Sequence, residues 1–193
     1  MKNIIFSVLM ALIGIYAIAC QGGEREAEIP KTRTRVVPDK AEESIPEIRI
    51  TSPAFVHEGL IPARYTCDGE DICPELVCKN VPEEAQSLAM ICDDPDAPGG
   101  TWVHCVVYNI SPVDTCISKE QISEGKECVM GKNSWGKSEY GGPCPPSGTH
   151  RYFFKIYALD KKLELEPGAT KEEVINAMDG HILAMGELMG TYQ

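Results

Sequence analysis

Short apolar runs, separated by clusters of proline and glycine, constrain the fold of this chain more than any other feature. Four runs have the length and residue types of β-strands: Leu76 to Val81, Ser87 to Cys92, Trp102 to Ile110 and Arg151 to Leu159. In the third run, one face is expected to carry Trp102, His104, Val106, Tyr108 and Ile110, and the other Val103, Cys105 and Val107. Because both faces are largely apolar, the pattern predicts a layered, mainly β domain with its strands buried on both sides.

One helix is expected near the carboxyl end. Thr170 and Glu173 form a capping box, in which each side chain binds the backbone N–H of the other residue. Apolar residues then follow with helical spacing, namely Val174, Ile175, Met178, Ile182 and Met185. The tail from Glu187 to Gln193 is expected to pair as a last strand.

The amino-terminal residues have the features of an export signal. Lys2 gives a positive start, and an apolar run from Ile4 to Ala19 ends directly before Cys20. The motif resembles a bacterial lipobox with Ala17 where leucine is commoner, so residues 1–19 are predicted to be removed and Cys20 to carry lipid. An uncleaved anchor and cleavage without lipid stay open. Gln21 favours the outer membrane in a cell with two membranes, which predicts a protein of the cell envelope.

Residues 20–47 are charged, interrupted by proline and poor in aromatic residues, which is typical of a flexible tether. The folded domain is expected over residues 48–193, where Ile48 and Ile50 begin to alternate with polar residues. The formal net charge of -11 and the absence of a basic cluster argue against binding to nucleic acid.

Nine cysteines are many for a chain of this length, and export would permit disulfides. Eight remain when Cys20 is set aside, an even number that permits full pairing. Cys92 and Cys105 lie in apolar runs and could equally be small buried hydrophobic residues. Because no Cys-x2-Cys pair is present, the sequence predicts no metal site, and it indicates no cofactor.

A carboxylate-rich turn follows the second strand. Pro95 and Pro98 fix the backbone here, so Asp94 and Asp96 are expected to be held in place. Two interpretations stay open, a ligand site and an Asx-type turn stabilised by its own carboxylates. Calcium fits poorly, since the later ligands of an EF-hand are missing.

Two histidines could contribute to a site near this turn. Taken alone, His104 on its strand is more typical of a hydrogen-bonded core histidine. His150 is better placed, because it follows a loop rich in glycine and proline, residues 141–148, whose backbone could approach an anion closely. Arg151 alternates to the opposite face, where it is expected to pair with the carboxylates of the turn.

Several motifs together resemble the prokaryotic branch of the phosphatidylethanolamine-binding protein family, which includes Raf kinase inhibitor protein. The resemblance runs from about Ile48 to Tyr192. The motifs, in order, are Ser52-Pro53-Ala54-Phe55, Tyr65-Thr66-Cys67-Asp68-Gly69-Glu70-Asp71, Asp94-Pro95-Asp96-Ala97-Pro98, Gly100-Thr101-Trp102-Val103-His104, Tyr140-Gly141-Gly142-Pro143-Cys144-Pro145-Pro146, His150-Arg151-Tyr152 and Gly180-His181-Ile182-Leu183. The resemblance implies an antiparallel β-sandwich around a large central sheet, with a carboxy-terminal helix.

The resemblance also implies a pocket for phosphate or a phosphorylated headgroup. Its implied residues fall into three groups: Asp94, His104, His150 and the wall residue Tyr152; the closing loop at Gly142 and Pro143; and the supporting residues Asp96, Pro98 and Arg151. The sequence departs from the branch at Cys78 and Cys105, where tryptophan is usual, so either the pocket is roomier or the thiols have a new role.

The resemblance places Cys67 and Cys144 at the same end of the sandwich, so a disulfide between them is a candidate. Pairing of Cys67 with Cys73, or a free Cys144, stays open because spacing does not determine connectivity.

The predicted function is that of an exported, membrane-tethered binding protein with a small-anion pocket. Its expected partners are a small anion or phosphorylated headgroup and the membrane, with a protein target and a second copy of the chain as further candidates. The alternative is an inhibitor or scaffold for an envelope protease or another enzyme. A hydrolase is less well supported, because no serine or cysteine nucleophile stands in a recognisable context.

Overall fold

The computed structural model describes residues 45–113, 116–117, 122 and 128–193. The predicted export signal, Cys20 and residues 20–44 of the predicted tether lie outside the described residues. Within the described part of the chain, no helix is long and apolar enough to cross a membrane.

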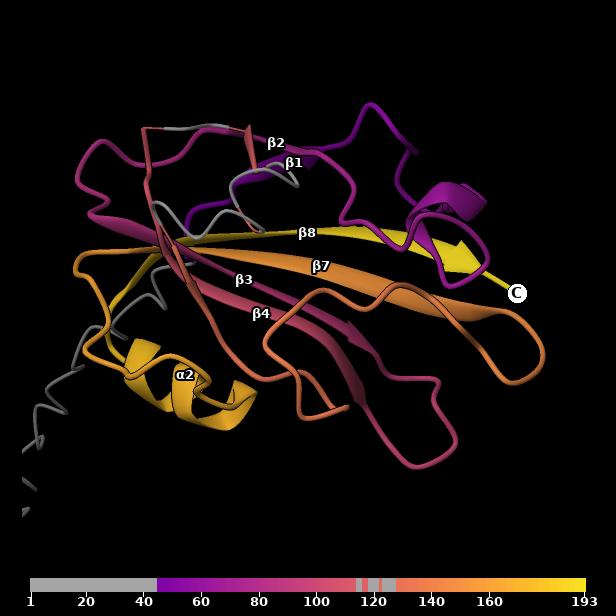
Figure 1. Cartoon of the computed structure of the whole chain (residues 1–193). Helices are drawn as coiled ribbons and strands as arrows, with labels where there is room; N and C mark the ends of the chain where they lie inside the picture. The colour runs from indigo at the N-terminus through magenta and orange to yellow at the C-terminus, as the bar shows by residue number, and fades with distance from the viewer. Residues whose placement is uncertain (1–44, 114–115, 118–121, 123–127) are drawn as a thin grey trace, which may run out of the picture. The chain divides into compact units, whose positions relative to one another are not determined.

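A five-stranded antiparallel sheet forms the centre of the domain (Figure 1). Its strand order is β6 (Val129–Met130), β4 (Trp102–Ile110), β3 (Ser87–Asp94), β7 (His150–Leu159) and β8 (Ile182–Tyr192). All residues of β3 are buried, as expected for a strand with neighbours on both edges and layers on both faces.

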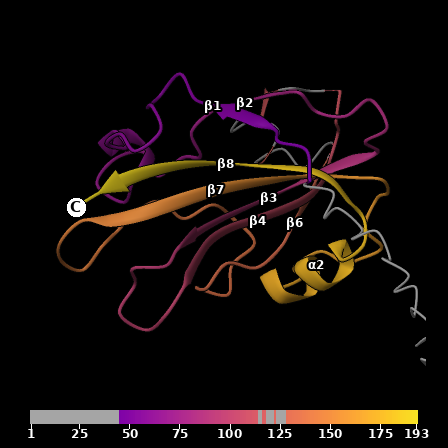
Figure 2. The same ribbon diagram turned by 180° about the vertical axis from the view of Figure 1, so that it is seen from behind.

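A smaller sheet covers one face of the large sheet, which gives the predicted mainly β sandwich (Figures 1 and 2). It consists of β1 (Arg49–Thr51), β2 (Leu76–Lys79) and β5 (Cys116–Ile117) in antiparallel order. The core between the two sheets includes Leu76, Leu88, Met90, Phe154 and Ile156. Removal of these side chains from water supplies the main driving force for this packing.

The helix α2 (Lys171–Met178) lies on the opposite face of the large sheet (Figure 2). Its predicted capping box is present, since the Thr170 side chain accepts from the Glu173 N–H and the Glu173 carboxylate accepts from the Thr170 N–H. Val174 and Met178 pack into a second core with residues of β3 and β4.

The helix is shorter than its apolar spacing predicts. It ends at Met178, and Gly180 takes a left-handed conformation with φ of 74° directly afterwards. Ile182 and Met185 therefore belong to β8, which pairs with β7 from Leu159 to His150. The backbone hydrogen bonds of this long ladder replace the extra helical turns, so the expectation for these two residues was wrong.

The outer edge of β8 is covered by the chain that precedes β2. The backbone of Ile48 donates to Met185, and that of Ile61 donates to Thr191. The short 3-10 helix η1 (Ala63–Tyr65) follows this segment. An unpaired strand edge can pair with other chains. This segment covers the outer edge of β8.

Candidate functional site

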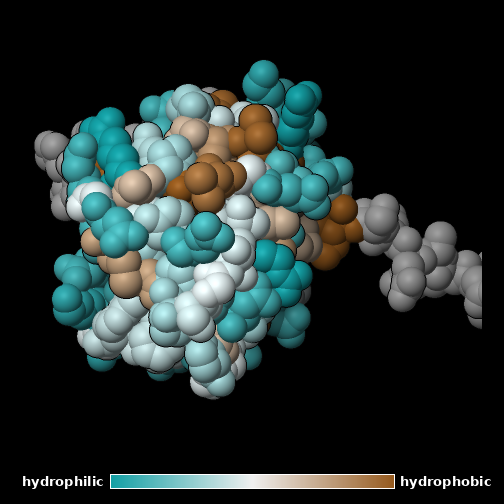
Figure 3. Space-filling view, turned by 90° about the vertical axis from the view of Figure 1, so that its right-hand side faces the viewer, coloured by the Kyte–Doolittle hydropathy of each residue, from teal (hydrophilic) through white to brown (hydrophobic). Residues whose placement is uncertain are grey.

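A pocket of about 270 Å³ opens at the end of the large sheet where β3 ends and β4 and β7 begin. Figure 3 views the molecule from this end and shows a mostly hydrophilic face with separate apolar spots in its upper half. The lining residues are Asp94, Ala97, Pro98, Gly99, Trp102, His104, Trp135, Cys144, Pro145, Pro146, His150 and Tyr152. The structure thus brings together Asp94, His104, His150 and Tyr152, which come from three strands.

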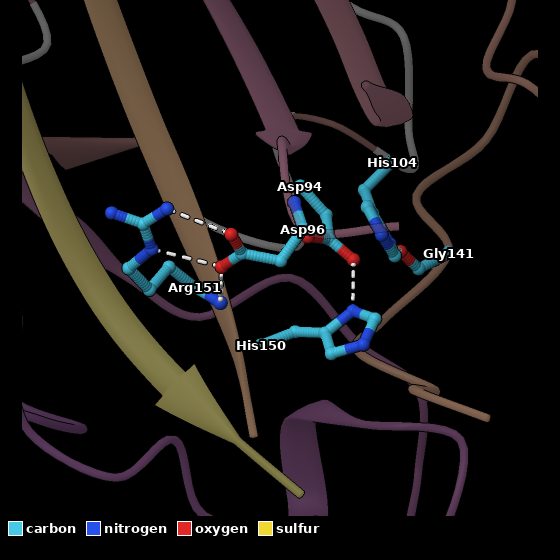
Figure 4. A network of polar contacts seen from close by, with 6 residues as sticks. All are labelled: Asp94, Asp96, His104, Gly141, His150 and Arg151. Atoms are coloured by element: carbon cyan, nitrogen blue, oxygen red, sulfur yellow. Dashed lines mark hydrogen bonds and ion pairs between the residues drawn. The ribbon is translucent and has the colours of Figure 1, made fainter. Parts of the chain in front are cut away.

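Asp94 uses both of its carboxylate oxygens. Oδ1 accepts from the backbone N–H of Asp96 across 2.8 Å, which forms the turn, and Oδ2 lies 2.7 Å from Nδ1 of His150 (Figure 4). Both side chains are more than nine-tenths buried. The Asx-type turn is therefore present, and the same carboxylate also orients an imidazole.

His104 reaches the pocket through a β-bulge. Cys92 pairs with Cys105, whereas the next residue, Asp93, pairs with Val103, so His104 has no partner on β3. Such an extra residue bends the strand and turns its side chain to a new direction. The predicted alternation along this strand was wrong for the same reason, because Val103 packs in the core on the helix side while Cys105 packs between the sheets.

The imidazole of His104 is held by one hydrogen bond and two aromatic contacts. Its Nδ1 lies 2.7 Å from the carbonyl oxygen of Gly141, and its ring meets those of Trp135 and Tyr152 edge-on, with 5.2 Å between ring centroids in both contacts (Figure 4). Burial lowers the pKa of His104, although the Gly141 carbonyl and Asp94 oppose this change. The neutral imidazole is therefore favoured.

Tyr152 contributes a hydroxyl group that has no hydrogen-bond partner. Its side chain is fully buried, and the oxygen makes no hydrogen bond within the described residues. Burial raises the pKa of Tyr152; the nearby N–H of Cys144 opposes the rise without reaching hydrogen-bonding geometry. Buried polar groups are normally paired, so this hydroxyl is an exception among the described residues.

Arg151 and Asp96 form an ion pair outside the pocket. The guanidinium makes two hydrogen bonds to the carboxylate, of 2.7 and 2.8 Å, as Figure 4 shows. The Arg151 hydrogen bonds lower the pKa of Asp96 to about 2. The Arg151 side chain is 52% exposed, so the pair braces the turn at the surface and does not contact the pocket.

A disulfide joins Cys67 to Cys144, with 5.5 Å between their Cα atoms. Cys73, the alternative partner, is a buried free thiol. The backbone N–H of Cys67 also donates to the carbonyl of Pro143 across 3.1 Å, which ties the loop to η1 and the residues after it. Cys144 itself lines the pocket.

The loop residues Gly142 and Pro143, which were expected to close the pocket, do not belong to its lining. Pro143 is absent from the lining, and Gly142 borders a neighbouring hollow of about 240 Å³. The Gly142 N–H donates to the Asp71 carboxylate across 2.6 Å. A Cβ at this glycine would lie 2.5 Å from the Tyr65 carbonyl oxygen, so the position requires glycine. Pro145 and Pro146 form the wall, and Pro98, expected only as support, joins the lining.

Sequence reasoning missed the two tryptophans of the pocket. Trp102 and Trp135 are the only tryptophans in the chain, and their rings meet edge-on with 5.3 Å between centroids. Trp135 comes from the irregular stretch before the loop, far from Trp102 in sequence. The sequence did contain a signal for them. Trp102 lies two residues before the candidate His104, and Trp135 lies shortly before the glycine-rich loop.

Cys78 and Cys105 lie in the core between the two sheets, and both side chains are fully buried. Neither residue lines the pocket. Cysteine in place of the usual tryptophan at these two positions therefore does not enlarge the pocket directly. Among the described residues, no group of three or more histidine, cysteine or acidic side chains could hold a metal ion.

The sequence profile of the phosphatidylethanolamine-binding protein family matches residues 51–193. The chain belongs to this family. A relative named UPF0098 protein from Methanothermobacter thermautotrophicus is 51% identical over 149 residues, which are 76% of this chain and 99% of that protein. A UPF0098 protein from Pyrococcus horikoshii is 39% identical, and the match covers 100% of this chain and 90% of that protein.

Solved structures agree with this assignment. A putative phosphatidylethanolamine-binding protein homologue from Chlamydia trachomatis is 45% identical, with a TM-score of 0.70, over 76% of this chain and 97% of that one. The Escherichia coli protein YbcL, described as a new member of the mammalian family, is 28% identical with the same TM-score, over 76% and 98% of the two chains. The mainly β fold expected from the sequence is thereby confirmed.

Proposed function

We propose that this chain is an exported, lipid-anchored protein that binds a small anion of the phosphate or phosphorylated-headgroup type in the pocket described above. The observation that carries the proposal is the convergence of two imidazoles and a carboxylate at one pocket. Nδ1 of His104 lies 2.7 Å from the Gly141 carbonyl oxygen and Nδ1 of His150 lies 2.7 Å from the Asp94 carboxylate, so the second nitrogen of each ring is the atom that can meet a ligand. The three side chains border one pocket of about 270 Å³.

The size and surroundings of the pocket support a small ligand with an apolar portion. Trp102, Trp135 and the prolines form apolar walls. The polar groups lie close together, where β3 ends and β4 and β7 begin. Such a combination of apolar walls with a few placed polar groups is typical of small-molecule sites. An imidazolium at either histidine would donate to an anion, so binding is expected to be tighter at mildly acid pH.

Binding of phenyl phosphate to the full chain, measured by calorimetry, tests the pocket. His150→Ala should weaken binding by at least about tenfold, since it removes a charged-group hydrogen bond. The matched control is His181→Ala, because His181 pairs with Asp160 away from the pocket lining. Equal affinities for the two variants would contradict the proposal, as would an affinity that does not change between acid and alkaline pH. Vesicles containing phosphatidylethanolamine, tested by co-sedimentation, distinguish a lipid headgroup from a free phosphate ester.

Export and lipid attachment are supported by two observations. The chain carries a disulfide, which is typical of proteins in oxidising compartments. The match to the Pyrococcus horikoshii relative extends over the whole chain, including its apolar start. Labelling of cells with a radioactive fatty acid should mark the wild-type protein and not the Cys20→Ser variant. Mature protein that still begins at Met1 would contradict the lipoprotein assignment.

A further inference from the structure

The outer face of β7 and β8 carries four cross-strand pairs of side chains. Along both strands, every second side chain is buried between the two sheets, and those between them point to the helix side of the large sheet. The outward pairs, counted from the pocket end, are Arg151 with Thr191, Phe153 with Met189, Lys155 with Glu187, and Tyr157 with Met185. Aromatic residues, methionine and arginine are the types that are enriched at protein interfaces.

Most of this face is open to solvent. The helix α2 packs into a core with residues of β3 and β4, and of the eight outward side chains only Tyr157 packs against that core. The Arg151 side chain is 52% exposed, Met185 is 36% exposed, and Glu187 is exposed as well. Within the described part of the chain, no element covers the outer face of β7 and β8 as α2 covers that of β3 and β4.

The charges on this face are not balanced locally. Asp93 supplies one carboxylate, and the ammonium groups of both Lys155 and Lys171 lie against it, at 3.0 and 2.5 Å. One positive charge is therefore in excess at a partly buried position. Glu187 stands opposite Lys155 in the register, yet it makes no ion pair or hydrogen bond with any described residue. The face thus presents an excess cation beside an unused carboxylate.

The ring of Phe153 is ordered by its neighbours on the same strand. The guanidinium carbon of Arg151 lies 5.7 Å from the ring centroid, and Nζ of Lys155 lies 5.5 Å from it. Such contacts between cations and aromatic rings stabilise the position of the ring. An aromatic side chain that is already ordered loses little conformational entropy when a partner covers it.

We infer that this face is a self-association surface, which a second copy of the chain covers. The two copies are related by a two-fold axis that runs parallel to the strands, between β7 and β8. This operation places β7 of one copy over β8 of the other and keeps the two residues of each cross-strand pair at one level. Lys155 of each copy then faces Glu187 of the other, and Phe153 faces Met189.

Self-complementarity is the reason to choose a second copy as the occupant. A two-fold interface requires that a residue and its counterpart attract each other in both directions. Each level of this face joins two different residues, a cation with an acid or an aromatic ring with methionine, so every contact is favourable twice. An anionic membrane surface fits less well, because Glu187 lies in the middle of the face and the chain carries a formal net charge of -11.

The association is expected to be weak. A standard interface uses about 20 to 30 residues on each side, and this face offers far fewer. Sedimentation velocity of the full chain, from about 10 µM to about 1 mM, should therefore show a dimer that forms as the concentration rises.

Glu187→Lys tests the central contact of the inference. In this variant, two lysines face each other across the axis, so the dissociation constant of the dimer should rise at least about tenfold. Glu83→Lys is the matched control, because it makes the same change of charge at an exposed position on the turn after β2 and should leave the dimer unchanged. Circular dichroism of both variants checks that they are folded.

Cross-linking with a carbodiimide places the contact. The reagent activates a carboxylate, which then forms an amide with a lysine amine, while the reagent takes up the water and leaves as a urea. Because Lys155 and Glu187 are also neighbours within one chain, nitrogen-15-labelled and unlabelled protein are mixed before the reaction. Peptides that join a labelled Lys155 to an unlabelled Glu187 should be found, and they can come only from two copies.

Three results would overturn the inference. The first is a chain that stays monomeric up to about 1 mM, which is also the result expected if a different protein covers this face. The second is self-association that Glu187→Lys weakens no more than Glu83→Lys does. The third is a set of cross-links between Lys155 and Glu187 in which both peptides always carry the same label. None of these results concerns the pocket, so the anion-binding proposal stands or fails separately.

Discussion

Asp93 and Asp94 are consecutive residues of β3 that serve different parts of the molecule. Asp93 points to the helix side of the sheet, where its buried carboxylate lies 3.0 Å from Nζ of Lys155 and 2.5 Å from Nζ of Lys171, the first residue of α2. Asp94 faces the pocket and lies 2.7 Å from Nδ1 of His150. Both carboxylates are almost completely buried.

The difference between the two sites lies in the partners. Lysine keeps its charge at all physiological pH values, so Asp93 forms a fixed ionic link between the sheet and the helix. Lys171 stands at a helix amino terminus, where the helix dipole disfavours a cation, and Asp93 offsets this effect. Histidine has two ring nitrogens, so Asp94 binds Nδ1 of His150 and leaves Nε2 for a ligand. Burial of a carboxylate alone therefore does not identify a binding site.

The largest effect is expected from loss of the disulfide at the pocket end. The bridge closes a loop of 77 residues, and the chain-entropy relation gives about 4 kcal/mol of stabilisation for a loop of this length. The double variant Cys67→Ser/Cys144→Ser should lose most of this free energy of unfolding in urea and should bind phenyl phosphate more weakly, because Cys144 lines the pocket. Reductant should lower the stability of the wild type and leave the double variant unchanged. A double variant as stable as the oxidised wild type would contradict the expectation.

Asp93→Asn should be the next largest change. It leaves two lysines, whose side chains are only 28% and 20% exposed, without a carboxylate, at a cost of about 3 kcal/mol in the free energy of unfolding. Phenyl phosphate affinity should stay close to that of the wild type. A large loss of affinity with unchanged stability would show that the comparison between the two carboxylates is wrong.

Asp94→Ala is expected to show the opposite pattern. Affinity for phenyl phosphate should fall by roughly 10- to 100-fold, because His150 loses the group that orients it. Stability should fall by only about 1 kcal/mol, since Pro95 and Pro98 still restrict the turn. Calorimetry and urea unfolding on the same preparation give both values. A variant that binds normally but unfolds readily would assign Asp94 a purely structural role.

The smallest effect is expected at the surface ion pair of Asp96 and Arg151. Because the arginine is more than half exposed, Asp96→Ala should reduce stability by only a fraction of the loss in Asp93→Asn. The pKa of Asp96 is lowered from 3.8 to about 2, so its contribution is complete above pH 3.8 and is lost as the pH falls toward 2. Urea unfolding should therefore separate variant from wild type at pH 7 and not at pH 2. Arg151→Ala should behave in the same way, and a clear difference between the two variants would argue against a simple pair.

Local chemistry made several parts of this structure predictable. The apolar runs at β3, β4 and β7 could be read from residue type and length, and the capping box at Thr170 from a spacing of three residues. The prolines around Asp94 correctly indicated a turn. The end of α2 was not predicted, because apolar residues beyond Gly180 fit a helix and a strand equally well until β7 provides backbone partners.

The sequence by itself determined that the segments of β2, β3, β4 and β7 are strands, where the helix begins, and that carboxylate, imidazole and phenol groups lie at strand ends. Tertiary structure alone decided how these groups function. The bulge at His104 depends on pairing with β3, the tautomers depend on Gly141 and Asp94, and Trp135 reaches the pocket only through the folding of a loop. Segment identity follows from short-range backbone and side-chain preferences. Which ring nitrogen of each histidine donates depends on partners up to 56 residues away in the sequence, and no local pattern encodes such a contact.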